Sequence, residues 1–109
     1  MTQPERRRYP RFKVQVPVQV QAGGGRLEGM LKDLCRDAVL VETASALDLG
    51  SAVSLTAELP GTGGPVHMVG RVVRLAAGAG GRHDLAILFT SVSTAAEARI
   101  DDFIALQAT

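Results

Sequence analysis

FKVQVPVQVQ, residues 12–21, is the segment from which the fold can be inferred most directly. Every second residue in it is apolar, and the residues between are polar or proline. A period of two over this length predicts a strand with one face in the core and the other in water. Pro17 has no N–H to donate, so we expect this strand to lie at a sheet edge or to be interrupted locally.

Five further segments downstream also have strand character, and turns rich in glycine or proline separate them. The segments are residues 26 to about 34, 38–43, 52–59, 66–75 and 84–89, with a glycine-rich connection at 76–81. Six short strands with closely spaced turns predict a sandwich or a small barrel.

The C-terminal segment changes from strand to helix periodicity. Thr94 followed by Glu97 predicts a capping box, in which each side chain bonds the other residue's N–H. Apolar residues then recur at helical spacing through Ile100, Phe103 and Ile104 to Gln107. The predicted fold is therefore a β-barrel closed by one C-terminal helix.

Length and composition indicate one soluble globular domain. With 109 residues, 46% of them hydrophobic and 21% charged, the chain suffices for one core. We expect a flexible tail at residues 1–5 and a single domain at 6–109. No apolar run is long enough to cross a bilayer, so membrane insertion is not expected. The lone Cys35 cannot form an internal disulfide, which is typical of the cytoplasm.

Positive charge is concentrated at the N-terminus. Residues 1–13 contain Arg6, Arg7, Arg8, Arg11 and Lys13 against Glu5, a balance of +4, while the remainder has seven basic and ten acidic residues, a balance of −3. Such a patch attracts anions locally, but a nucleic-acid binder usually spreads its basic surface further. DNA and RNA are therefore not expected partners.

The sequence offers no set of residues for catalysis. His67 and His83 are isolated from other metal ligands, and no base near Cys35 in the sequence activates its thiol. Asp101 and Asp102 are neighbours on the helix and point in different directions, so a solvated helix face is the simpler interpretation. We expect a protein that is not an enzyme.

Two segments remain as candidate binding motifs. The first is RRYPR, residues 7–11, directly before the first strand. Pro10 favours an extended conformation at Tyr9, and the arginine fork suits phosphate oxygens or the O6/N7 edge of guanine. On charge alone, a solvated basic tail is the simpler interpretation. The second segment is DLCRDA, residues 33–38, between the second and third strands.

Together these segments resemble the paired signature of PilZ domains, the bacterial receptors for cyclic di-GMP. That signature is Arg-x-x-x-Arg before the first strand and Asp/Asn-x-Ser-x-x-Gly between the second and third. Arg7 and Arg11 match the first motif, and Asp33 matches the start of the second. Residues 39–43, 70–75 and 85–89 also look like strands of the family, so the similarity covers roughly residues 6–106. It implies a small six-stranded antiparallel barrel with a C-terminal helix.

The resemblance also implies a site. Arg7 and Arg11 would grip the phosphates and guanines of cyclic di-GMP, and Asp33 would accept hydrogen bonds from a guanine edge. Arg8 would add a phosphate contact or remain a solvated neighbour. The implied partners are cyclic di-GMP as ligand, with no other cofactor, and an unidentified effector protein. Ligand would close the arginine-rich segment on the barrel and change the surface presented to the effector.

The second motif departs from the family at two positions, where Cys35 replaces serine and Ala38 replaces glycine. A thiol is a weaker donor than a hydroxyl, at a cost of about 0.5–1.5 kcal/mol. If the backbone at Ala38 needs a positive φ, strain adds roughly 1–2 kcal/mol. The sum, about 2–3 kcal/mol, predicts binding weakened about 30- to 150-fold. The alternative hypothesis is a protein-interaction adaptor that has kept the barrel and lost the ligand.

Overall fold

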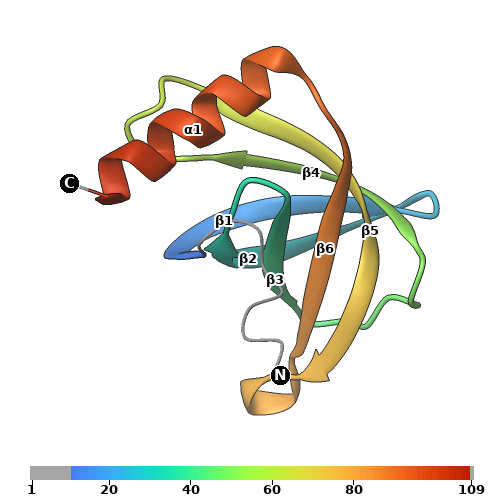
Figure 1. Ribbon diagram of the computed structural model, residues 1–109. Helices are drawn as coiled ribbons and strands as arrows, with labels where there is room; N and C mark the ends of the chain where they lie inside the picture. The colour runs from blue at the N-terminus through green and yellow to red at the C-terminus, as the bar shows by residue number, and fades with distance from the viewer. Residues whose placement is uncertain (1–10, 109) are drawn as a thin grey trace, which may run out of the picture.

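The computed structural model describes residues 11–108, with side chains through Gln107. The tail expected at residues 1–5 lies outside this range. The elements in chain order are β1 (Phe12–Ala22), β2 (Gly25–Leu34), β3 (Ala38–Thr43), β4 (Ala52–Glu58), β5 (Pro65–Ala77), a short 3₁₀ turn η1 (Ala79–Gly81), β6 (His83–Val92) and α1 (Thr94–Ala108). Figure 1 shows the strongly curved strands with α1 lying across one end of them.

The six strands form a closed barrel in the order β1-β2-β3-β6-β5-β4, and every neighbouring pair is antiparallel. This confirms the predicted six-stranded barrel with one C-terminal helix. The β5–β6 hairpin is longer than predicted, because its ladder continues to the pair Ala77–His83. The segment expected as a loop at 76–81 is therefore largely strand and η1, with Gly80 and Gly81 supplying the positive φ that the tight reversal needs.

Pro17 does not lie on an edge strand, because β1 is hydrogen-bonded to β2 on one side and to β4 on the other. The alternative, a local interruption, agrees with the register. The β1–β4 ladder begins at Val18, one residue after Pro17, and the β1–β2 ladder shifts between Lys13 and Val16. The missing N–H of Pro17 thus lies where pairing with β4 has ended.

The core is largely aliphatic, in keeping with a chain that has no tryptophan and few other aromatic residues. Alternate residues of β1 point inward and meet the inward residues of the other five strands. The largest fully buried side chains include Leu31, Leu34, Leu55, Met68, Leu85, Ile87 and Ile100. Burial of these side chains is the main stabilising term for a barrel of this size.

Helix α1 contributes to the same core through Ala96, Ile100 and Phe103. Its N-cap is Ser93, one residue before the predicted Thr94. The Ala96 N–H donates to Ser93 Oγ at 3.1 Å, and the Glu97 N–H donates to the Ser93 carbonyl at 2.8 Å. The predicted capping box is therefore wrong: adjacent serine and threonine can both cap, and the position where the chain leaves β6 selects Ser93.

Candidate functional site

A pocket of about 230 Å³ opens at the turn between β2 and β3 and extends across β3 and β6 to β5. It is lined by Arg11, Asp33, Leu34, Cys35, Asp37, Ala38, Val39, Leu40, Arg74, Ala86 and Leu88. Four of the six site residues expected from the sequence, Arg11, Asp33, Cys35 and Ala38, thus line one pocket. The two motifs lie far apart in the sequence, and β1–β2 pairing brings them together.

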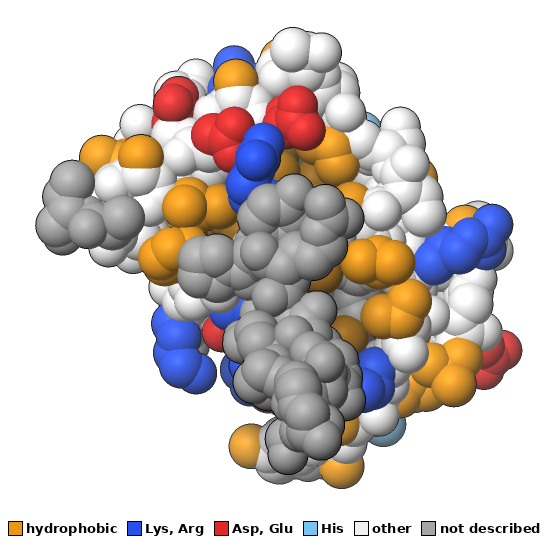
Figure 2. All heavy atoms as spheres, in the orientation of Figure 1, with side chains coloured by type: hydrophobic (Ala, Val, Ile, Leu, Met, Phe, Trp, Pro, Cys, Tyr) orange, Lys and Arg blue, Asp and Glu red, His pale blue; other side chains and the backbone are white. Residues whose placement is uncertain are grey.

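The remaining expected residues, Arg7 and Arg8, lie outside the described part of the chain. Arg11, the residue directly before β1, lines this pocket. Figure 2 shows apolar side chains and the side chains of lysines or arginines close together on the viewed face of the barrel.

Arg11 and Asp33 form a loose ion pair, with Arg11 Nη1 and Asp33 Oδ2 3.9 Å apart. This separation is longer than a hydrogen bond, so both groups keep capacity for other partners. The Asp33 side chain is 12% exposed and the Arg11 side chain 45%. Asp33 therefore offers acceptor oxygens in a largely enclosed position, and Arg11 offers donors at the mouth of the pocket.

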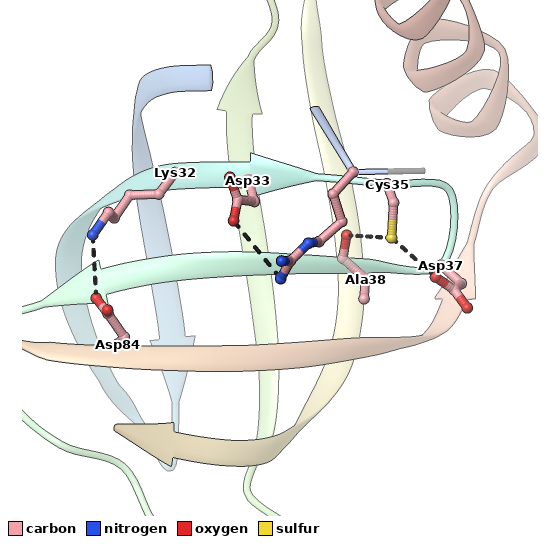
Figure 3. A network of polar contacts seen from close by, with 7 residues as sticks. Lys32, Asp33, Cys35, Asp37, Ala38 and Asp84 are labelled. Atoms are coloured by element: carbon pink, nitrogen blue, oxygen red, sulfur yellow. Dashed lines mark hydrogen bonds and ion pairs between the residues drawn. The ribbon is translucent and has the colours of Figure 1, made fainter. Parts of the chain in front are cut away.

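Cys35 directs its thiol into its own turn. Its Sγ donates to Asp37 Oδ1 at 3.1 Å and to the Ala38 carbonyl at 3.5 Å (Figure 3). Its N–H donates to the same carbonyl at 2.9 Å. Burial raises the pKa of the Cys35 thiol, and the hydrogen bond to Asp37 raises it further. The thiol therefore stays protonated at neutral pH and is a poor nucleophile.

Ala38 is not strained, because no non-glycine residue in the described range has a positive φ. The conditional strain of roughly 1–2 kcal/mol expected at this position therefore does not arise. Only the weaker donor at Cys35 remains, at about 0.5–1.5 kcal/mol, which corresponds to about 2- to 13-fold in affinity. The methyl group of Ala38 instead contributes to the pocket wall.

The β2–β3 turn is attached to two other elements. Arg36 Nε lies 2.8 Å from Asp101 Oδ1 and Arg36 Nη2 lies 3.3 Å from Asp101 Oδ2, so the turn is paired bidentately with α1. The Phe89 N–H of β6 donates to the Asp37 carbonyl at 2.8 Å. The sequence predicted only a solvated helix face at Asp101. In the structure, Asp101 also pairs with Arg36 and so holds the turn that carries the second motif.

Arg74 is a pocket residue that the sequence analysis missed. It lines the pocket from β5, a strand that carries neither motif. The signal in the sequence is the pair Val72-Val73, which interrupts the alternation that buries Val66 and Met68. Without a register for β5 against β6, that signal does not say which way Arg74 points.

Other candidate chemistry finds little support among residues 11–108. His67 is exposed and its Nδ1 lies 2.8 Å from Thr56 Oγ1. Within this range no three His, Cys, Asp or Glu side chains are grouped to hold a metal ion. None of its helices is long and apolar enough to cross a membrane.

Solved structures show the same fold at low sequence identity. MotI/DgrA, an inhibitor of motility of Bacillus subtilis, has 17% identity and a TM-score of 0.82 over 99% of this chain and 54% of its own. The PilZ domain of YcgR from Escherichia coli, solved with cyclic di-GMP, has 18% identity and a TM-score of 0.75 over 95% and 92%. The PilZ domain of CeSA from a cellulose-synthesizing bacterium has 18% identity and a TM-score of 0.65 over 92% and 99%.

The chain thus spans about half the length of MotI/DgrA and nearly the whole of the isolated YcgR and CeSA domains. No protein with a curated description matches it in sequence. The family model for the PilZ domain matches residues 5–106, a range that includes both motifs, all six strands and most of the helix. The chain belongs to the PilZ domain family.

Proposed function

We propose that this chain is a cyclic di-GMP receptor domain of the bacterial cytoplasm, a regulator rather than an enzyme. The observation that carries the proposal is the pocket where Arg11 of the first motif meets Asp33 of the second at 3.9 Å. A donor-only arginine and an acceptor-only carboxylate side by side match the mixed donor and acceptor edges of guanine. The YcgR domain solved with cyclic di-GMP supports this choice of ligand.

Pocket size agrees with a ligand that is only partly enclosed by the barrel. Its volume of about 230 Å³ is below the roughly 300–1,000 Å³ of pockets that bury a whole small molecule. Part of a dinucleotide would therefore remain outside, where we propose that Arg7 and Arg8 contact it. Closure of the arginine-rich segment over that part would change the surface presented to an effector protein, which is the switch we propose.

Calorimetric titration of the folded chain with cyclic di-GMP tests the proposal. We expect Arg11→Ala and Asp33→Ala each to weaken binding about 13- to 160-fold, since each removes hydrogen bonds to a charged group. Arg7→Ala should have a similar effect. Arg26→Ala is the matched control, because Arg26 is exposed at the far end of β2 and outside this pocket. Absence of binding by the folded wild-type chain at high micromolar ligand would overturn the proposal.

The departures of the second motif give a gain-of-affinity test. Cys35→Ser with Ala38→Gly should strengthen binding about 2- to 13-fold, because the hydroxyl is the better donor. Ala38→Gly alone should change affinity little, since Ala38 is not strained. An unchanged affinity in the double variant would show that these positions do not weaken the binding of the ligand.

A second candidate function is a PilZ-like protein-interaction adaptor that no longer binds cyclic di-GMP. The observation that favours it is the Cys35 thiol, which bonds Asp37 and Ala38 of its own turn and so is not directed to a ligand. Under this alternative the wild-type chain gives no binding signal, and the serine and glycine substitutions restore one.

A further inference from the structure

We propose that Arg74 contacts the ligand and donates to the O6/N7 edge of guanine, which makes it a specificity-determining residue of the pocket. This inference rests on the proposed function, because it assumes that cyclic di-GMP occupies the pocket. It adds to the two PilZ motifs a third group, on β5, that lies outside both of them.

A β-bulge turns Arg74 out of the barrel and toward the pocket. Strand β5 buries every second residue from Val66 to Val72, and the same period would place Arg74 inside the barrel. The register with β6 shifts at this point: Val72 pairs with Ile87, and Arg74 pairs with Ala86. Val73 is therefore the extra residue, and Arg74 shares the outward face with Ala86.

Strand β2 turns Asp33 outward in the same way. Leu31 pairs with Val41 and Asp33 pairs with Leu40, so Lys32 is the extra residue of a second irregularity. Each of the two shifts directly precedes a charged residue of the pocket. Bulges occur often beside binding sites, where they redirect a side chain that regular alternation would bury.

Asp33 and Arg74 lie at the two ends of a row of paired residues that crosses four strands. The row runs Asp33–Leu40–Ala86–Arg74, and all four residues line the pocket. Three strand spacings of about 4.8 Å separate its ends, or about 14 Å along the sheet. Leu40 and Ala86 between them form an apolar floor on which the flat face of a base can lie.

The ends of this row complement the edges of guanine. Asp33 accepts hydrogen bonds, which suits the N1–H and N2–H₂ donors, and Arg74 donates, which suits the O6 and N7 acceptors. Adenine presents an N6–H₂ donor where guanine has O6, so the arginine fork would face a donor there. The row therefore favours guanine.

Arg74 is available for such a contact. Its side chain is exposed, and no carboxylate of residues 11–108 lies within ion-pair distance of it. By contrast, Arg71 on the same strand donates to the Gly50 carbonyl at 2.8 Å, outside the pocket. Arg71 therefore provides a matched control.

The test titrates the folded full chain with cyclic di-GMP and with its 7-deazaguanine analogue, which lacks the N7 acceptor. We expect Arg74→Ala to weaken cyclic di-GMP binding about 5- to 150-fold. The wild-type chain should bind the analogue less tightly than cyclic di-GMP, and Arg74→Ala should reduce this preference. Arg74→Lys, which keeps the charge and loses the fork, should be intermediate, and Arg71→Ala should behave as the wild type.

The outcomes separate this inference from the proposed function. If Arg11→Ala weakens binding and Arg74→Ala does not, the role of Arg74 is overturned and the receptor function stands. If Arg74→Ala weakens binding but keeps the wild-type preference for cyclic di-GMP over the analogue, the guanine-edge contact is overturned. If the wild-type chain does not bind cyclic di-GMP, both fail.

Discussion

The thiol of Cys35 is buried and donates a hydrogen bond to Asp37. Both effects raise its pKa, burial the more strongly. The protonated form is therefore favoured in the folded protein relative to the unfolded chain. Removing the thiol should change how stability depends on pH.

We expect the free energy of unfolding of the wild-type chain to fall, relative to that of Cys35→Ser, as the pH rises above about 9, the ordinary pKa of the thiol. The folded pKa is raised, so this contribution is complete below the unfolded pKa and is lost as pH rises through the folded value. Urea unfolding of both proteins at a series of pH values, from 7 to above the ordinary thiol pKa of about 9, measures the difference. Curves that stay parallel over this range would contradict the prediction.

Gly70 is a residue whose side-chain position is already occupied. A Cβ built there would collide with the Leu88 carbonyl oxygen and would lie 2.8 Å from Ile87 Cγ2. Gly70→Ala should therefore destabilise the protein by about 1–3 kcal/mol, measured by urea unfolding. Gly25→Ala is the control, because its Cβ would meet only the Ala22 carbonyl at 3.7 Å. Equal stabilities of the two variants would be the contrary result.

Among the strands, the same periodicity predicts burial correctly in β1 and incorrectly in β2 and β5. In β1 the alternation of residues 12–21 agrees with the burial of Val16, Val18 and Val20. In β2 and β5 the register shifts before Asp33 and Arg74 break the period. A local pattern cannot locate such a shift, because it depends on the partner strand.

The N-cap of α1 gives a test of how one element begins. Ser93→Ala should lower the free energy of unfolding by about 0.5–2 kcal/mol, because it removes the acceptor of the Ala96 N–H. Thr94→Ala should cost less, since Thr94 is already inside the helix. Thermal and urea unfolding of both variants measure the effect, and the reverse order would restore the predicted capping box.

In the complete molecule, α1 joins the barrel core rather than resting on its surface. Phe103 and Ile100 are each 2% exposed and belong to the same cluster as the inward residues of the strands. Arg99 Nη1 also donates to the Pro65 carbonyl at 3.2 Å, and Asp101 pairs with Arg36. The helix therefore contributes to the stability of the whole barrel.

Phe103→Ala should lower the free energy of unfolding by about 3–5 kcal/mol, because it leaves a cavity between α1 and the strands. Leu49→Ala is the control, since Leu49 is 63% exposed and its truncation should change stability by less than about 0.5 kcal/mol. Urea unfolding compares the two. Similar losses in both variants would show that α1 is not part of the core.

Much of the fold and part of the pocket could be predicted from the sequence. The six strands and the helix were predicted from periodicity and turn residues, which are local properties of the chain. The roles of Arg11, Asp33, Cys35 and Ala38 in one site were implied by the resemblance to PilZ domains. Arg74 was missed, since its place in the pocket depends on pairing between β5 and β6.

Local patterns in the chain were enough to predict six strands and a C-terminal helix, because hydrophobic alternation and turn residues act over a few neighbouring positions. The resemblance to PilZ domains added the two motifs and the six-stranded barrel. Three features are visible only in the folded structure. Asp33 and Arg74 lie at the two ends of one row of outward-facing residues, Ala38 is unstrained, and Arg36 pairs with Asp101. These features depend on register and docking between segments far apart in the chain, which no local pattern specifies.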